Sequence, residues 1–317
     1  MSKTIVNISV DTEFSTHLED IGIIGKINGK QYGIPMIADL LDRYGLKATF
    51  YVDVYTNKDE YTSALRTICL MLKDRGHDLQ LHTHPCGLFD PRREGMKDYN
   101  LNEQIEIIHK GQVLFWEWFG KVPIAHRAGD WFANENTLNA LIANNIFVDS
   151  SLFFGWPNCQ LNQLAITQNS AVNYEGLLEL PATSFRCFDL GLFSPYRLLS
   201  TDGNSFYETW FILKSMQAQG AKLITTVYHS FSFLQWNNKR SQYWASSNRI
   251  RKFEKFLKYL SDDSSLEVLT VEEIFNNYQN KKYDILSDKD IIHKSNWELT
   301  LLRFADRYLD KRGMSAI

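Results

Sequence analysis

Strand-like and helix-like segments alternate along almost the whole chain, and this alternation restricts the fold more than any other feature of the sequence. Short apolar runs rich in β-branched residues predict strands at 4–10, 47–54, 77–84, 122–127, 146–149, 177–180, 222–228 and 266–269. Apolar residues at helical spacing predict helices at 34–44, 61–73, 101–119, 135–144, 205–219, 249–260 and 270–278. A repeated order of strand and then helix is typical of a parallel sheet or barrel in the α/β class.

The pattern changes near residue 281, where this alternation stops. The last stretch carries Trp297, Leu301 and Phe304 among its apolar residues and predicts a terminal helix. The chain has 317 residues, whereas a single α/β barrel commonly uses about 200 to 250. We therefore expect an α/β barrel over residues 1–280 and a C-terminal helical extension over residues 281–317.

Charge and cysteine usage exclude several classes of protein. The 34 basic and 37 acidic residues give a net charge of −3, which offers no basic surface for a nucleic-acid backbone. The four cysteines lack paired spacing and predict reduced thiols. No apolar run approaches the ~20 residues that span a bilayer, and the N-terminus becomes polar before a signal-peptide core is complete. We expect a cytoplasmic protein without a transmembrane segment, and the sequence predicts no particular oligomeric state.

Two carboxylates follow the first predicted strand. Ligands in parallel α/β folds meet the carboxyl ends of the strands, so polar residues at those ends are candidates for a site. Asp11 and Glu13 are two residues apart and point the same way in an extended chain. Because like charges repel, the pair indicates a metal site or a shared proton. The alternative is an acidic strand end that enters a turn.

Two histidines follow the same rule at the end of the third predicted strand. His82 and His84 are also two residues apart, so both imidazoles can face one point. Neutral imidazole suits zinc, cobalt or nickel. A structural role would explain one such ring more easily than a close pair.

Three further strand ends carry Arg127, Asp149 and His229. Arg127 follows an apolar run and requires a carboxylate partner, either to orient a catalytic acid or as a plain structural ion pair. His229 adds a titratable imidazole at the same edge of the sheet. So many polar strand ends are rarely produced by independent structural roles, and the sequence predicts a site there.

The order of these motifs resembles the polysaccharide deacetylase family, carbohydrate esterase family 4, over about residues 4–278. The matching segments are Val10-Asp11-Thr12-Glu13, His82-Thr83-His84-Pro85, Arg127-Ala128-Gly129-Asp130-Trp131, Val148-Asp149-Ser150-Ser151 and Val227-Tyr228-His229. The resemblance implies a distorted (β/α)7 barrel and one divalent ion, Zn²⁺ with Co²⁺ or Ni²⁺ as alternatives. It also implies a role for each residue: base Asp11, metal ligands Glu13, His82 and His84, Arg127 orienting Asp11, and general acid His229 tuned by Asp149.

Two departures from the family pattern leave alternatives open. Thr12 separates the two acidic residues, and Cys86 stands where the family has its second histidine, so Cys86 is an alternative to His84 as third ligand. The resemblance implies removal of an N-acetyl group from an acetamido sugar. Without an export signal, we expect a nucleotide-linked or lipid-linked sugar in surface-polysaccharide (O-antigen or capsule) biosynthesis. The competing hypotheses are an amidase for another linear or cyclic amide and a catalytically silent carbohydrate-binding barrel.

Overall fold

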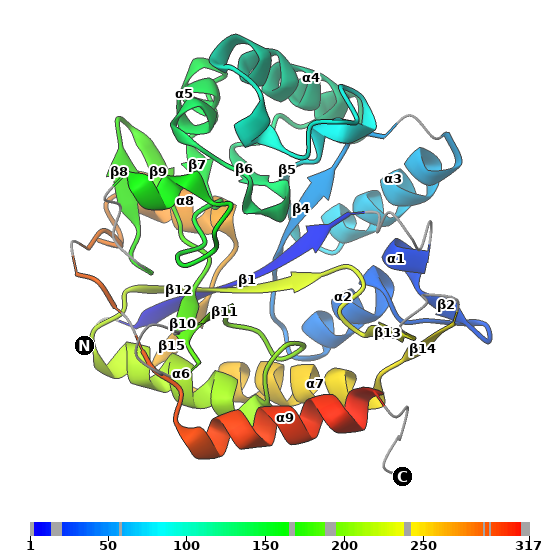
Figure 1. The fold of residues 1–317 in the computed structure, drawn as a ribbon, viewed down its shortest axis with the longest axis vertical. Coiled ribbons are helices and arrows are strands. Elements are labelled where there is room, and N and C mark those ends of the chain that lie inside the picture. Colours follow the sequence, from blue (N-terminus) through cyan, green and yellow to red (C-terminus); the bar gives the residue numbers. More distant parts are fainter. Residues whose placement is uncertain are drawn as a thin grey trace.

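A curled, mainly parallel sheet forms the centre of the computed structural model (Figure 1). The structure describes residues 3–13, 21–56, 59–164, 169–187, 195–237, 242–287, 289–291 and 293–311. The parallel strands lie in the order β12 (Leu223–His229), β1 (Thr4–Thr12), β4 (Thr49–Asp53), β5 (Asp78–Thr83), β6 (Ala125–Ala128), β7 (Val148–Asp149) and β9 (Leu177–Glu179). At the far edge β8 (Val172–Tyr174) pairs antiparallel with β9. β15 (Leu266–Val268) pairs with the beginning of β1.

Helices surround this sheet (Figure 1). They are α2 (Ile34–Arg43), α3 (Asp59–Asp74), α4 (Leu101–Phe119), α5 (Glu135–Ala143), α6 (Phe206–Ala218), α7 (Ser247–Asp262), α8 (Val271–Gln279) and α9 (Trp297–Lys311). Each predicted strand and helix is present within a few residues of its expected bounds. The predicted α/β class and distorted barrel with parallel strands are confirmed.

Several short elements were not predicted from the sequence. They are α1 (Ile21–Ile24), the hairpins β2 (Lys26–Ile27) with β3 (Lys30–Gln31), β10 (Ser184–Arg186) with β11 (Tyr196–Leu198) and β13 (Leu234–Trp236) with β14 (Tyr243–Ala245), and the 3₁₀ helices η1 (Pro85–Gly87), η2 (Met96–Asp98), η3 (Gly129–Trp131) and η4 (Gln160–Gln163). Two or three residues are too few to establish a period of hydrophobicity. Their positions follow from tertiary contacts.

Local sequence explains where the longer helices begin and end. At the start of α4 the Asn100 side chain accepts a hydrogen bond from the backbone N–H of Glu103, and the Glu103 side chain accepts one from the N–H of Asn100. Gly120 ends the same helix in the left-handed conformation, which lacks a steric penalty only for glycine. These signals fix the helix locally, so its bounds match the prediction.

The two ends of the parallel ladder, β12 and β9, are joined by the segment that follows β9. The Thr183 N–H donates to the Thr225 carbonyl oxygen at 3.0 Å, and the Thr225 N–H donates to Thr183 Oγ1 at 2.9 Å. Both threonines are buried. A side chain therefore closes the barrel where a regular ladder is missing.

Helix α9 packs against the barrel through charged residues. Arg303 and Glu208 of α6 form an ion pair at 2.8 Å in which both side chains are buried, and Asp310 is buried beside Ser246 and Arg249. Its apolar residues Trp297, Leu301, Leu302, Phe304 and Tyr308 are exposed instead. The division into residues 1–280 and 281–317 stays a prediction, and residues 312–317 lie outside the described residues. Across the described part of the chain, no helix combines the length and apolar character needed to cross a membrane.

Candidate metal centre and catalytic site

The strand register brings the predicted site residues to one edge of the sheet. Asp11 of β1 pairs with His229 of β12, and Asp53 of β4 pairs with His82 of β5. His82 in turn pairs with Arg127 of β6. The carboxyl ends of five neighbouring parallel strands thus carry acidic and basic side chains, as the ligand-binding rule for such sheets predicts.

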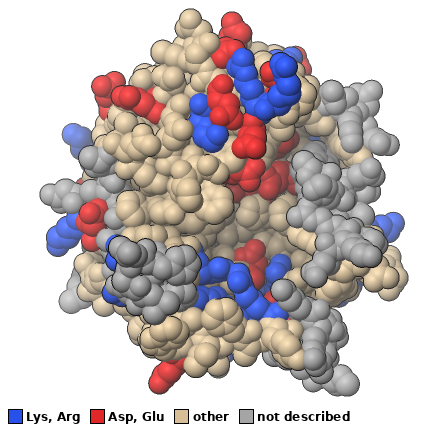
Figure 2. All heavy atoms as spheres, viewed as in Figure 1, with Lys and Arg blue, Asp and Glu red and all other residues tan. Residues whose placement is uncertain are grey.

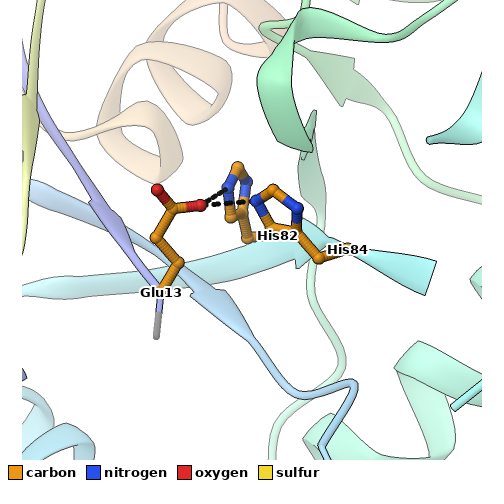
Figure 3. A group of neighbouring side chains, drawn as sticks. All are labelled: Glu13, His82 and His84. Atoms are coloured by element: carbon orange, nitrogen blue, oxygen red, sulfur yellow. Dashed lines mark hydrogen bonds and ion pairs between the residues drawn. The ribbon is translucent and has the colours of Figure 1, made fainter. Parts of the chain in front are cut away.

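Glu13, His82 and His84 point toward one another from the ends of β1 and β5 (Figure 3). Glu13 Oε2 lies 3.3 Å from His82 Nε2 and 2.5 Å from His84 Nε2. One ligand atom from each residue lies within 4.8 Å of the other two, and no other group of this kind occurs among the described residues. Cys86 does not belong to it, so the geometry favours His84 as the third ligand.

A backbone hydrogen bond of His82 determines which of its ring nitrogens can bind a cation. His82 Nδ1 lies 2.9 Å from the Arg127 carbonyl oxygen, which only accepts, so Nδ1 carries the proton of the neutral ring. His82 Nε2 therefore turns a lone pair toward the Glu13 carboxylate. Two electron-rich atoms at 3.3 Å repel unless a cation lies between them. The donor set of two imidazoles and a carboxylate fits Zn²⁺.

The pKa values of Glu13 and His84 describe the same site without an ion. Burial alone lowers the pKa of His84, but the charge and hydrogen bond of Glu13 raise it to about 10. Burial alone raises the pKa of Glu13, but the charge of His84 and the close contacts with both histidines lower it well below its usual value. Without an ion, a proton on His84 therefore neutralises the charge of Glu13, which a bound metal ion would otherwise neutralise.

Gly129, the first residue of η3, leaves the space in which the His84 ring lies. A Cβ built on Gly129 would be 2.4 Å from His84 Cε1 and 2.5 Å from Nε2. No side chain larger than hydrogen fits there without moving the imidazole. Gly129 is thus a positioning residue of the metal group.

Asp11 and Arg127 form a buried ion pair beside this group. Arg127 Nη1 donates to Asp11 Oδ1 at 2.6 Å. Arg127 Nε and Nη2 donate to the backbone oxygen and Oγ of Ser150, each at 3.0 Å, and the Tyr51 ring centroid lies 4.1 Å from the guanidinium carbon. These contacts fix the guanidinium, and the guanidinium fixes the carboxylate.

His229 lies across the metal group from His82. Its Nε2 is 3.9 Å from Glu13 Oε1, its side chain is 33% exposed, and its ring stacks on Phe231 with centroids 5.1 Å apart. The His229 backbone N–H donates to Ser232 Oγ at 2.9 Å. A partly exposed imidazole at this position can exchange protons with a bound molecule and with solvent.

Asp202 is a second acidic residue near His229, connected to it through Ser232. Ser232 Oγ donates to Asp202 Oδ2 at 2.6 Å. Burial alone raises the pKa of Asp202, but the charge of Arg249, hydrogen bonds from Ser200 and Ser232, and the charge of His229 lower it below its usual value. Asp202 is therefore an anion at neutral pH, and Ser232 links it to the backbone of His229.

Asp149 belongs to a separate buried cluster. Its Oδ1 lies 2.9 Å from His126 Nδ1 and accepts from Ser151 Oγ at 2.7 Å. Glu179 pairs with it in the β7–β9 ladder, where burial and the charge of Asp149 raise the pKa of Glu179 well above its usual value. Tuning of His229 by Asp149 stays a prediction, and the hydrogen bonds of Asp149 in the described structure go to His126 and Ser151.

Three residues near the site escaped the sequence reasoning: Gly129, Asp202 and Asp53. Gly129 stands inside the arginine motif, yet its contact with His84 depends on the path of η3. Asp202 lies in a loop between two elements, where nothing local distinguishes it from other polar residues. Asp53 ends β4 beside the histidines, and the strand-end rule would have found it.

Comparisons with known proteins bear on the fold. No family model and no curated protein matches the sequence. A crystal structure of a protein assigned as a polysaccharide deacetylase from Mycobacterium smegmatis matches with a TM-score of 0.59 and 17% identity, covering 91% of this chain and 94% of that one. A similarly assigned protein from Pseudomonas aeruginosa PAO1 matches with a TM-score of 0.54 and 11% identity, over 88% and 92% of the two chains.

A third solved structure with the same fold carries a different name. The Puue allantoinase matches with a TM-score of 0.56 and 11% identity, covering 89% of this chain and 93% of that one. The chain therefore has the polysaccharide deacetylase fold, as its motifs predicted. Because one fold serves more than one reaction, the choice of substrate depends on the residues of the site.

Proposed function

We propose that the protein is a metal-dependent hydrolase of the polysaccharide deacetylase family that removes the N-acetyl group from an acetamido sugar. The observation that carries the proposal is the group of Glu13, His82 and His84, whose ligand atoms lie within 4.8 Å of one another at the mouth of the barrel. The Asp11–Arg127 pair and His229, which end the neighbouring strands beside this group, supply the acid–base groups that amide hydrolysis requires.

The chain's own residues perform the proton transfers. An ion held by Glu13, His82 and His84 supplies Lewis acidity, which polarises a carbonyl and lowers the pKa of water. Asp11 is the base, because Arg127 holds Oδ1 and no hydrogen bond to Oδ2 occurs among the described residues. Oδ2 is therefore free to accept a proton from the attacking water.

His229 is the general acid that protonates the departing amine. Its partly exposed ring lies beside Glu13, where it can exchange protons with a bound substrate. We assign the positioning of His229 to Asp202, which binds Ser232 beside the His229 backbone, and a supporting structural role to Asp149. Loss of His229 should then reduce turnover and leave metal content unchanged.

The substrate that we propose is a nucleotide-linked or lipid-linked acetamido sugar, used in the biosynthesis of a surface polysaccharide such as an O-antigen or a capsule. Zn²⁺ is the proposed ion, since its preference for imidazole and carboxylate matches the three ligands.

Acetate release from a panel of acetamido sugars tests the proposal. The wild-type protein loaded with Zn²⁺ should release acetate, and Asp11→Asn should lower kcat by about 100-fold or more because the base is lost. His229→Ala should lower kcat with unchanged metal content. A wild type that binds glycans but holds no metal and releases no acetate would instead support the silent carbohydrate-binding barrel.

Hydrolysis of a cyclic amide is a second candidate, favoured by the similarity to the Puue allantoinase at a TM-score close to that of the deacetylases. Cyclic ureides belong in the same screen, with ring opening followed by loss of amide absorbance. Turnover of a cyclic ureide without acetate release from any acetamido sugar would replace the deacetylase assignment.

A further inference from the structure

Three guanidinium groups gather between β11 and α9, outside the metal group. Arg197 lies in β11, opposite Phe185 of β10. Arg303 and Arg307 are four residues apart on α9 and so lie on the same side of that helix. Like charges this close destabilise one another unless anions lie among them.

The carboxylates nearby neutralise only part of this charge. Glu208 binds Arg303 at 2.8 Å and also accepts from Ser295, so its charge is already used. Arg197 donates to neutral acceptors, Asn204 Oδ1 at 2.9 Å and the Gly203 carbonyl oxygen at 2.8 Å. Arg307 is exposed and has no hydrogen bond or ion pair with any described residue. Among the described residues, two of the three guanidinium groups therefore lack a carboxylate partner.

The pKa values of these arginines reflect the uncompensated charge. Burial, and then repulsion from Arg307 and Arg303, lower the pKa of Arg197 to about 10. Burial, followed by repulsion from Arg303 and Arg249, also lowers the pKa of Arg307. An anion bound between the two side chains would remove this repulsion.

The loop that holds Arg197 also reaches the catalytic site. Arg197 donates to the carbonyl oxygen of Gly203. Asp202, the residue before Gly203, accepts a hydrogen bond from Ser232, whose Oγ accepts one from the backbone N–H of His229. Figure 2 shows Lys and Arg side chains gathered beside a central hollow, on the side toward α7 and α9. A ligand that occupies this hollow therefore has basic side chains beside it.

We propose that Arg197 and Arg307 bind a phosphate or diphosphate group of the substrate, which is then a phosphorylated acetamido sugar. Guanidinium groups bind phosphate oxygens through paired N–H donors, and two that have no carboxylate partner among the described residues provide both the charge and the donors. This inference rests on the proposed function for the identity of the sugar, whereas the anion site itself does not depend on turnover.

Calorimetric titration of the Zn²⁺-loaded protein with inorganic pyrophosphate tests the site. Arg307→Gln and Arg197→Gln should each weaken binding about tenfold or more, since each removes a charge-assisted hydrogen bond. Arg92→Gln, which alters an arginine with an 87% exposed side chain, is the matched control and should bind as wild type does. Raising the salt concentration should weaken binding to wild type more than to the variants.

Two sources of the phosphate are separated by further arms. Binding of UDP favours a nucleotide-linked sugar, and binding to vesicles that contain polyprenyl phosphate, but not to vesicles of phosphatidylcholine alone, favours a lipid-linked one. Pyrophosphate affinity that is absent in wild type, or unchanged in Arg307→Gln, overturns the proposal even if Arg197→Gln does not fold. Intact pyrophosphate binding without acetate release would leave this site standing and reject the proposed deacetylation alone.

Discussion

The metal group depends on a contact between two single residues, Gly129 and His84. The imidazole of His84 lies over the glycine, at distances that exclude any Cβ. His84 in turn approaches Glu13 to 2.5 Å. The types of the three ligands are visible in the sequence, but the space that one of them occupies is created by a residue 45 positions away.

Replacing Gly129 by alanine should therefore displace His84 and weaken Zn²⁺ binding by about 10- to 100-fold, the usual effect of losing a residue that supports a ligand. Competition against a chromophoric chelator measures the affinity. Gly176→Ala is the control, because nothing lies within 4 Å of the added Cβ although φ is +97°. That variant should lose stability and keep its metal affinity. Equal affinity in Gly129→Ala and wild type would remove Gly129 from the site.

The paired strands β7 and β9 carry a buried carboxyl pair, Asp149 and Glu179. Glu179 Oε1 accepts from the Leu152 N–H at 3.0 Å, and its other oxygen is buried without a partner apart from Asp149 beside it. Because burial and Asp149 raise the pKa of Glu179 well above its usual 4.5, the folded protein keeps a proton there at neutral pH.

This proton makes stability depend on pH. A carboxyl group with a raised pKa in the folded state contributes stability that is complete below its unfolded pKa and is lost as pH rises toward its folded pKa. Glu179→Gln keeps a neutral group, so its free energy of unfolding relative to wild type should increase by roughly 1.4 kcal/mol per pH unit above about pH 5. Urea unfolding of the metal-free proteins at several pH values measures the difference. The exposed Glu175→Gln is the control. An equally flat pH dependence of the free energy of unfolding in both variants would contradict a proton on Glu179.

Helix α9 shows how an element can be predicted while its role is not. Its apolar residues indicate a helix, and the structure contains it at Trp297–Lys311. Patterning alone would turn Leu301 and Phe304 toward the barrel. The buried Arg303–Glu208 pair turns the helix the other way and leaves these residues exposed. The partner of Arg303 lies on α6, so only the tertiary structure could reveal it.

At the scale of the whole molecule, the metal group joins strands from distant parts of the sequence. Glu13 follows β1, the histidines belong to the end of β5, and His229 ends β12. An ion bound by the folded chain and not by the unfolded one stabilises the entire barrel.

Zn²⁺ at 100 times its Kd should raise the free energy of unfolding by about 2.7 kcal/mol. Because the pKa of His84 is about 10 without metal, Zn²⁺ binding at pH 7 must release a proton from it. Affinity should therefore fall about tenfold for each pH unit on lowering the pH from 9. Calorimetry in buffers of different ionisation enthalpy counts the protons, with His84→Ala as the variant that should release one fewer. Binding to wild type without proton release would reject the His84–Glu13 pairing.

The sequence alone determined the order of strands and helices, the polar strand ends and the kinds of ligand at the site. Periodicity and strand-end position are local properties, so β1, β5 and β12 with Glu13, His82, His84 and His229 followed from them. The tertiary structure decided which residues meet: Asp202 with Ser232 near His229, Asp149 with His126, Gly129 with His84, and Arg197 with Gly203. These contacts join residues through backbone register and loop paths that no local pattern encodes.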